Sequence, residues 1–504
     1  MGSAPSKAAD TAPAVSEKEA YIVQLLCDDE REFVQRLTVL DLAAAPFSEH
    51  GALTPSVLKH WEEEAAKDLR LGLARTILSH TDIASALLSR AALIADSHVF
   101  NVSLPANPAP VTNQRSSGRC WLFATTNIIR YSVISKLNLK EFELSQSYLF
   151  FWDKLEKANY FLESSIQNAH LPIDDRLVSY LSKDPISDGG QWDMVCNLLE
   201  RYGVVPQAIF PESFSSSASS RLNKIVTLKL REHSLILREL AASASSSSSS
   251  SVAKALRAKK EECLSEIYRI MSIALGVPPS ADKTFTWEYY DANDKVRRWE
   301  GTPIEFYKSF SSEKYPPLEA FSLINDPRNP YDALYSVASL GNVWGARPVR
   351  YVNTSTDRLK DTVLKCIKAG HPVFFGCDVG QFSHTQSGVM DTNIFDYENA
   401  FGVTFGLTKA QRLQVNESAM THAMVITAVH IDQATKKIVR FKVENSWGED
   451  AGKKGYFVMT DKWFDEFVYQ VVVPRSLADK DFVEILDHGE ATVFPPWDPM
   501  GTLA

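Results

Sequence analysis

The sequence predicts an α+β fold in which a mainly helical part precedes a β-rich part. One sign is an apolar, helix-competent run at residues 121–129, followed by an aromatic-rich helical pattern at 144–158. Another is the change after Tyr331 to short apolar runs and period-two alternation, which indicates strands. The length of 504 residues exceeds one ordinary domain, and it leaves room for a large, mostly helical insertion at residues 211–330.

The composition is that of a soluble globular protein, with 45% apolar and 23% charged residues. A net charge of -9 argues against nucleic-acid binding by the whole surface, but not against a local basic patch. The six cysteines are scattered without a C-x-x-C pair or zinc spacing, so we expect free thiols, a reducing compartment and no metal. No apolar run is long enough to predict a membrane-spanning segment.

The N-terminal residues 1–16 are small and polar, and we expect them to be disordered. Residues 17–97 are expected to form a helical extension, with helical patterns at 21–37 and 68–95. The start lacks the apolar core of a signal peptide, which favours a cytoplasmic protein. The acidic residues near the N-terminus are unlike those of a mitochondrial targeting sequence, and this disfavours a mitochondrial pool of the protein. The first six residues fit the N-myristoylation pattern, although a single acyl chain anchors only weakly.

Cys120 is the candidate nucleophile of the first lobe, which we expect at residues 98–210. It stands where a polar, glycine-containing turn meets the helix-competent run. Unpaired N–H groups and the helix dipole stabilise an anion there, so the thiol is expected to have a lowered pKa. Six residues earlier, Gln114 offers an amide N–H that, with the Cys120 N–H, suits an oxyanion. A buried structural cysteine is the alternative.

Gly189 and Gly190 precede a second helical pattern that begins near Trp192. Paired glycines allow a close approach of the backbone. They can leave an exposed edge that binds an extended peptide as an added strand, and this predicts a substrate-binding segment. A plain turn that leads into the helix is the alternative.

Within residues 211–330, a serine-rich run at 243–251 separates helical patterns at 222–240 and 252–275. Nine Lys and Arg residues against two Glu give Arg221–Lys260 a local charge of +7. A solvated helical face explains this charge most simply. Weak nucleic-acid binding through the local basic patch is the alternative.

The β-rich lobe is expected at residues 331–475, with a buried strand at 373–379 and a hairpin formed by 421–430 and 438–445. If His422 faces Asn445 in this hairpin, the turn centre falls within one residue of the middle of the polar segment 432–437. The hairpin is therefore expected to bring His422 and Asn445 side by side. The indole of Trp447 would then shield them from water.

Cys120, His422 and Asn445 together suit nucleophilic catalysis. The imidazole takes the thiol proton, and the amide oxygen on the other ring nitrogen fixes the tautomer and the orientation of the ring. A lone histidine on a strand is usually structural. A Gln-x5-Cys pattern at a helix start combined with a hairpin that carries His and Asn is much harder to obtain by chance.

These residues resemble the papain-like cysteine proteases, whose catalysis uses a Cys-His-Asn set. The run Asn445–Gly448 strengthens the resemblance. Two departures stand out. Ser117 replaces a cysteine that is disulfide-bonded in secreted relatives, and His422 follows Cys120 by 302 residues against about 130–150 in papain-like enzymes. The insertion supplies most of the difference.

From about residue 70 onward the chain resembles the bleomycin hydrolase family of papain-like cysteine aminopeptidases. The resemblance is carried by residues 114–124, 188–194, 285–289, 375–380, 420–424, 443–450 and 497–501. It implies a two-lobed papain-like core and an intracellular aminopeptidase of broad specificity that acts through an acyl-enzyme without a cofactor. It also implies peptides and bleomycin-like amides as substrates, a homohexamer, and nucleic-acid binding in some members.

Residues 476–504 are expected to form a C-terminal arm that reaches the active-site cleft. The stretch Phe494–Ala504 has three prolines and one charged side chain, which is unusual for an exposed terminus. The resemblance favours a tail in the cleft, with the Ala504 carboxylate facing the ammonium group of the incoming peptide. A tail packed on the protein's own surface is the alternative.

Two other functional classes stay open on the sequence. One is a transferase that passes the acyl group to an amine instead of water. The other is a nucleic-acid-binding protein in which the peptidase site is secondary.

Overall fold

The computed structural model describes residues 53–105, 110–242 and 249–503. The predictions for residues 1–16, for a helix at 21–37, for N-terminal acylation, for most of the serine run and for Ala504 lie outside these ranges. The chain divides into two compact units. Among the described residues, the first comprises 53–82 with Ala400–Gly402, and the second comprises 83–105, 110–242, 249–399 and 403–503.

The first unit contains helices α3 (Pro55–Lys67) and α4 (Leu69–Leu78). The Thr54 hydroxyl accepts a hydrogen bond from the Val57 N–H and so caps α3, and Asp68 caps α4 in the same way. No residue of either helix is buried. The helical pattern expected at 68–95 is interrupted, because Ser89 caps a new helix, α6 (Arg90–Ala95), after the short α5 (Ile83–Ala86).

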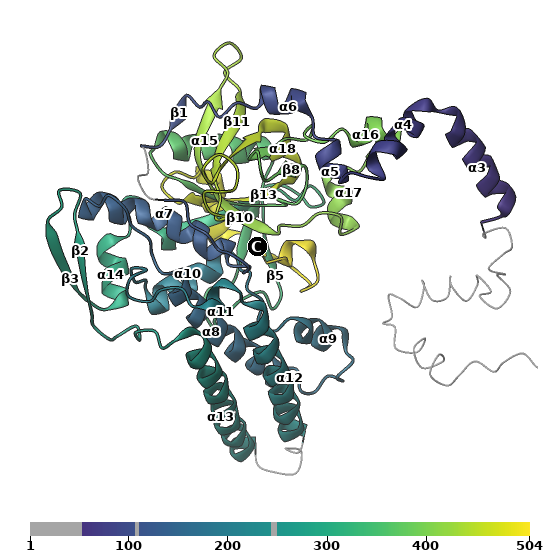
Figure 1. Ribbon diagram of the computed structural model, residues 1–504. Helices are drawn as coiled ribbons and strands as arrows, with labels where there is room; N and C mark the ends of the chain where they lie inside the picture. The colour runs from purple at the N-terminus through teal and green to yellow at the C-terminus, as the bar shows by residue number, and fades with distance from the viewer. Residues whose placement is uncertain (1–52, 106–109, 243–248, 504) are drawn as a thin grey trace, which may run out of the picture. The chain divides into compact units, whose positions relative to one another are not determined.

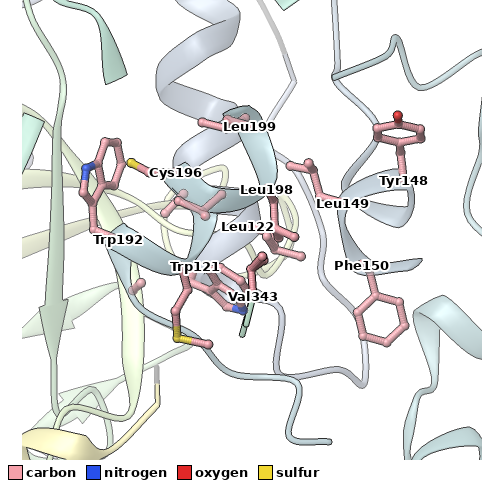
Figure 2. Close-up of a cluster of buried hydrophobic side chains, with 14 of the residues drawn as sticks. Trp121, Leu122, Tyr148, Leu149, Phe150, Trp192, Cys196, Leu198, Leu199 and Val343 are labelled. Carbon is pink, nitrogen blue, oxygen red and sulfur yellow. The ribbon is translucent and has the colours of Figure 1, made fainter. Parts of the chain in front are cut away.

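The helical part of the second unit is built on α7 (Cys120–Leu137) and α8 (Gln146–Gln167), which confirm the two helices expected there. Helices α9 (Arg176–Lys183) and α10 (Trp192–Tyr202) follow. Helices α7, α8 and α10 share a core of large apolar side chains, among which Figure 2 labels Trp121, Leu122, Tyr148, Leu149, Phe150, Trp192, Leu198 and Leu199. This core fixes the helix that begins at Cys120.

The insertion contains α11 (Phe214–Ser217), α12 (Ser220–Ala242) and α13 (Ser249–Leu275). Helices α12 and α13 run side by side as a long pair (Figure 1), and they correspond to the helices expected at 222–240 and 252–275. The segment also holds structure that was not predicted: a hairpin of β2 (Phe285–Tyr290) and β3 (Val296–Gly301), α14 (Pro303–Phe310), and a short helical turn, η4 (Pro317–Glu319).

A sheet of 12 strands forms the β-rich part of the second unit. Along its path the strand order is β14-β5-β6-β4-β13-β7-β10-β11-β12-β9-β8, and β1 pairs with β10. The strands are β1 (Val102–Ser103), β4 (Ala320–Ile324), β5 (Ala333–Val337), β6 (Arg350–Asn353), β7 (Val373–Cys377), β8 (Ser383–His384), β9 (Val389–Met390), β10 (His422–Ile431), β11 (Ile438–Glu444), β12 (Tyr456–Thr460), β13 (Val468–Pro474) and β14 (Thr492–Phe494). Fully buried β7 confirms the strand expected at 373–379, and β4 shows that the sheet begins before residue 331.

The remaining helices are α15 (Thr356–Lys368), α16 (Tyr397–Phe401), α17 (Lys409–Gln414), α18 (Asp461–Phe467), α19 (Lys480–His488) and the short η5 (Pro499–Gly501). Within residues 53–105, 110–242 and 249–503, no helix has both the length and the apolar character needed to cross a bilayer.

Strand β10 separates two hydrophobic cores and so positions the site. Ala423 and Val425 belong to the core that contains α7, whereas Met424 and Ile426 belong to the core on the other face of the sheet. This division follows from the alternation of side chains along a strand. Helix α7 packs directly on β10, which brings together the two elements that begin with Cys120 and His422.

Candidate active site

Cys120 is the first residue of α7, and only 2% of its surface is exposed. Burial raises the pKa of the Cys120 thiol to about 11. The backbone N–H groups of Ala423, Trp121 and Cys120 lower this pKa, but by less than burial raises it. The lowered thiol pKa expected from the helix terminus is therefore wrong, because loss of solvent outweighs the N–H groups. The contact with the Ala423 N–H places the thiol beside the residue that follows His422.

His422 and Asn445 are both buried, and the His422 Nε2 lies 2.9 Å from the Asn445 Oδ1. The same Oδ1 accepts a 2.8 Å hydrogen bond from the Ser446 N–H, which turns the amide oxygen toward the ring. Because an amide oxygen only accepts, the proton of the neutral imidazole sits on Nε2 and leaves Nδ1 as the base. The ring of Trp447 lies with its centroid 5.0 Å from that of the imidazole.

Burial also determines the charge state of the histidine. It lowers the pKa of His422 to about 4, and the hydrogen bond to Asn445 opposes this shift only in part. A buried thiol and a buried imidazole each favour the neutral form. Transfer of the thiol proton to the imidazole charges both groups at once, and their attraction at low dielectric offsets the cost of charging either alone. Transfer of the proton between the two groups would therefore cost less than ionisation of either group alone.

The hairpin that carries the histidine is confirmed, but its register is two residues from the expected one. Val425 pairs with Glu444, whereas direct opposition of His422 and Asn445 would have placed Lys442 there. A shift of two residues keeps every side chain on its original face of the sheet. Asn445 therefore becomes a diagonal neighbour of His422, and such a neighbour still lies within reach of the ring.

The loop before the nucleophile, Asn113–Arg119, is called the nucleophile loop and is joined to the segment that follows Asn445. The Gln114 N–H donates to the Ser446 carbonyl over 2.8 Å, and the Gly448 N–H donates to the Thr112 carbonyl over 3.0 Å. These antiparallel contacts place the oxyanion candidate and the histidine's amide partner in adjacent backbone segments. The two halves of the site are therefore fixed to each other by main-chain hydrogen bonds.

The side chain of Gln114 is held at both ends of its amide. Its Nε2 donates to the Ser117 carbonyl over 2.6 Å, and its Oε1 accepts from the Ser446 hydroxyl over 2.6 Å. An amide nitrogen carries two N–H groups, so one remains to donate to another acceptor. Because Ser446 occupies the oxygen, the amide cannot reverse, and the nitrogen stays on the side of the nucleophile loop.

Gly189 and Gly190 are buried beside the nucleophile. The Gly189 carbonyl accepts from the Lys157 ammonium over 2.6 Å, and its N–H donates to the Ser187 hydroxyl over 3.2 Å. A Cβ at Gly190 would lie 2.5 Å from the ring of Trp121, so only glycine fits there. Among the described residues, no hydrogen bond uses the N–H or the carbonyl of Gly190. Both groups are therefore unpartnered within the described part of the chain.

The C-terminal arm is anchored along its described length. Phe494 ends β14, which pairs with β5 in parallel. The Asp498 carboxylate accepts from the Arg328 guanidinium over 2.9 Å. Met500 is 2% exposed and belongs to the same core as α7. The arm is therefore a packed part of the fold.

The arm leads to the two glycines. The carbonyl of Thr502 accepts a 2.7 Å hydrogen bond from the Nε2 of Gln191, the residue that follows Gly190 and directly precedes α10. The other amide atom of Gln191, Oε1, is buried without a hydrogen-bond partner among the described residues. The expected role of the Ala504 carboxylate concerns a residue outside the described ranges.

A buried ion pair joins the nucleophile helix to the hairpin. The guanidinium of Arg130 on α7 binds the carboxylate of Glu444 on β11, with side-chain exposures of 1% and 0%. Arg130 also donates to the Pro110 carbonyl over 2.9 Å. Since Asn445 directly follows Glu444, this pair fixes the distance between α7 and the strand end that carries the amide.

Sequence reasoning missed the roles of Ser446, Arg130, Glu444 and Arg328. Ser446 adjoins Asn445, and this adjacency was the available signal. Arg130 is a charged residue inside a mainly apolar run, which indicates a buried charge that needs a partner, but nothing local to Glu444 identifies it as that partner. Nothing in the local sequence of Arg328 indicates that it binds the distant Asp498.

The basic patch of the insertion is mostly engaged within the protein. Six of its nine cationic side chains hydrogen-bond or pair with carboxylates or carbonyls of the chain: Lys229, Arg231, Arg238, Arg257, Lys259 and Lys260. In the part of the chain that the structure describes, no group of three or more His, Cys, Asp or Glu side chains is placed to hold a metal ion.

The chain is similar to known cysteine peptidases. The sequence profile of the Peptidase C1-like family matches residues 52–501. Cysteine proteinase 1, mitochondrial, from Saccharomyces cerevisiae (strain YJM789) is 43% identical over 454 residues, which are 89% of this chain and 92% of the relative. Bleomycin hydrolase from Homo sapiens is 42% identical over 444 residues, which are 87% of this chain and 95% of the relative. The crystal structure of PepW from Lactobacillus rhamnosis HN001 aligns with a TM-score of 0.84 at 40% identity, and the alignment covers 90% of this chain and 99% of PepW.

Proposed function

This chain belongs to the Peptidase C1-like family and is a papain-like cysteine peptidase, and from this premise we propose that it is an aminopeptidase of broad specificity. It removes residues from the free N-termini of peptides. The observation that carries the proposal is the C-terminal arm, which is anchored in the core and leads to Gln191 beside the Gly189–Gly190 segment.

Cys120 attacks the peptide carbonyl after its proton passes to the Nδ1 of His422. Asn445 holds the ring so that Nε2 keeps its proton. The carbonyl oxygen becomes an oxyanion and accepts hydrogen bonds from the free N–H of Gln114 and from the backbone N–H of Cys120. His422 then protonates the leaving amine, and an acyl-enzyme forms. A water molecule, deprotonated by His422, hydrolyses the acyl-enzyme and releases the acid.

The arm occupies the side of the cleft that would bind residues N-terminal to the scissile bond in a longer peptide. An extended substrate pairs with the free N–H and carbonyl of Gly190. The arm limits how many substrate residues can lie on the N-terminal side of the scissile bond. The proposed partner of the ammonium group of the first substrate residue is the Ala504 carboxylate, which lies outside the described residues. A charge-assisted contact of this kind contributes about 1.5–3 kcal/mol to the selection of free N-termini.

The proposal extends to further substrates and to a cellular location. The human relative is named bleomycin hydrolase, and this chain acts on bleomycin-like amides as well as on peptides. The yeast relative is named mitochondrial; this chain is cytoplasmic, with a mitochondrial pool as the alternative. All five described cysteines are free, which suits a reducing compartment.

Self-association completes the proposal, with a homohexamer as the assembled form. Leu69 and Leu73 of α4 are 86% and 63% exposed, and Ile225 and Leu228 of α12 are 52% and 67% exposed. Apolar side chains that gather on helix surfaces indicate protein–protein contacts. A second copy of the chain is the partner that covers them.

The decisive experiment compares one peptide with a free and with an acetylated N-terminus. The wild-type protein is expected to release the first residue of the free peptide and to leave the acetylated peptide intact. Cys120→Ala is expected to abolish turnover, whereas Cys366→Ala, which removes a buried thiol elsewhere, retains it. Equal cleavage of both peptides would identify an endopeptidase. Added amine distinguishes the transferase alternative, which predicts aminolysis products in place of the free acid.

A further inference from the structure

We propose that Asp188 is a positioning residue through which the helical insertion holds the nucleophile loop and the Gly189–Gly190 segment in place. The inference rests on the proposed role of Cys120 as nucleophile. It gives the insertion a task inside each protomer, in addition to any task in assembly.

The carboxylate of Asp188 is the meeting point of three parts of the chain. From the nucleophile loop, the Gly118 N–H donates to Oδ2 over 3.0 Å. From the insertion, the Ser219 hydroxyl donates to Oδ2 over 2.5 Å and the Asn223 amide donates to Oδ1 over 2.7 Å. From α8, the Lys154 ammonium lies 2.6 Å from Oδ1. Each oxygen therefore has two partners.

The backbone around Asp188 is attached to the same region. The indole N–H of Trp121 donates to the Asp188 carbonyl over 2.8 Å. Lys154 and Lys157, one turn apart on α8, donate to the carbonyls of Ile186 and of Ser187 and Gly189. A displacement of Asp188 would therefore move the residues before and after Cys120 together with the substrate-binding glycines.

The insertion supplies the part of this arrangement that the rest of the unit lacks. Ser219 immediately precedes α12, and Asn223 lies in its first turn. Ser219 shares Oδ2 with the Gly118 N–H, and Asn223 shares Oδ1 with the Lys154 ammonium. Without them, Asp188 would keep only Lys154 on Oδ1 and Gly118 on Oδ2, so its carboxylate would be held by half as many partners. Gly118 would then lose a fixed acceptor two residues before the nucleophile.

The charge of Asp188 gives the role a measurable signature. Burial raises the pKa of the Asp188 carboxyl group. The Lys154 ammonium and the hydrogen bonds from Ser219 and Gly118 outweigh this effect and hold the pKa of Asp188 well below its usual range, so the group stays ionised. This negative charge is one of the influences that raise the pKa of the Cys120 thiol. The thiol is contacted from β10 by the Ala423 N–H, and the Lys154 ammonium lies 2.6 Å from the Asp188 carboxylate. Removal of the Asp188 charge therefore makes the thiol easier to ionise.

The first test removes the contacts from the insertion. The double variant Ser219→Ala/Asn223→Ala keeps the Asp188–Lys154 pair. We expect its kcat on a peptide with a free amino group to fall about tenfold, with KM nearly unchanged. A small misplacement of reacting groups causes a loss of this kind. The matched control is Glu163→Gln. Glu163 on α8 binds Arg257 and Lys260 of α13, so this variant loosens the insertion without touching Asp188. It is expected to lower the thermal midpoint and to retain kcat.

The second test follows the thiol directly. The pH dependence of Cys120 alkylation by iodoacetamide is measured for the wild type and for Asp188→Asn, and the midpoint is expected to shift to lower pH in the variant. An unshifted midpoint, or a kcat loss in the double variant no larger than that of Glu163→Gln, would overturn the inference. If Asp188→Asn does not fold, the double variant decides. Alkylation requires no peptide, so this outcome is independent of the N-terminal preference in the proposed function.

Discussion

The Ser446 hydroxyl donates a 2.6 Å hydrogen bond to the Oε1 of Gln114, a residue 332 positions earlier in the chain. The bond fixes which end of the amide faces the nucleophile loop. Gln114→Ala should therefore lower kcat by roughly 10²–10³-fold, the usual loss for one oxyanion donor. Ser446→Ala should lower kcat less, since the donor remains but is free to rotate. Steady-state kinetics on one peptide measures both, and a larger loss for Ser446→Ala would show that the hydroxyl does more than orient the amide.

The two partners of the thiol differ in their roles, and their variants should differ in the same order. His422→Ala removes the base and is expected to reduce kcat to near the level of Cys120→Ala. Asn445→Ala removes only the 2.9 Å contact that orients the ring, so part of the activity should remain. Single-turnover acylation rates separate the two variants. A more severe effect of Asn445→Ala would contradict the assignment.

The buried histidines should make the fold sensitive to mild acid. Burial lowers the pKa of His422 and of His371 to about 4, whereas both titrate near the ordinary value of 6.5 when unfolded. The unfolded chain thus binds more protons below that value, and the free energy of unfolding should fall as the pH drops from 6.5 toward 4. Each histidine contributes roughly 3 kcal/mol to this loss.

Urea unfolding at several pH values measures this dependence. His422→Gln should flatten the acid limb by one histidine's share, and His371→Gln, a change away from the site, should do the same. An acid limb that both variants leave unchanged would show that other groups control the loss of stability.

The C-terminal arm should set the preference for a free amine. Deletion of residues 502–504 removes the carbonyl that Gln191 binds and should extend activity to acetylated peptides, while alkylation of Cys120 continues. Amidation of the Ala504 carboxylate should weaken the preference without opening the cleft. If the shortened protein cleaves free peptides at the full rate and still does not cleave acetylated peptides, the arm does not determine specificity.

Deletion from Met500 onward is a less specific variant of the same experiment. Met500 is 2% exposed in the main core, so its loss should also lower the free energy of unfolding by about 2–5 kcal/mol. Gln191→Ala, which removes only the side-chain amide, provides the matched comparison for both deletions.

The exposed apolar residues of α4 and α12 should support self-association. Sedimentation velocity at micromolar concentration is expected to show a species several times larger than the 56.3 kDa chain. Substitution of Ile225 and Leu228 by Asp should shift the distribution toward smaller species, whereas the same change at the exposed Phe214 serves as a control outside α12. A wild-type monomer at this concentration would exclude the assembly.

The α+β papain-like fold class is confirmed, and it could be predicted because its elements follow local rules. Helix α7 begins at Cys120 as expected, since a polar turn meets an apolar run at that residue. The hairpin was also predictable, from alternation on either side of a polar turn. Its register was not, because a shift of two residues satisfies the same alternation.

Burial and long-range pairing could not be predicted from local pattern. The helix start suggested a thiol of low pKa, but the depth at which β10 covers Cys120 depends on the packing of both lobes. Arg130 and Glu444 are 314 residues apart, and no local rule connects them. The hairpin of β2 and β3 was missed within a segment whose average pattern is helical.

The pair of Arg130 and Glu444 also has a consequence for the newly made chain. Domains fold progressively as the chain leaves the ribosome, N-terminal parts first. Gln114, Cys120 and Arg130 therefore emerge more than 300 residues before Glu444 and Ser446 reach them. Until then the thiol has neither its base nor a fixed oxyanion donor, and Arg130 has no counterion. On the proposed mechanism, a nascent chain is thus unable to digest itself or its neighbours until β10 and β11, which are synthesised late, complete the site.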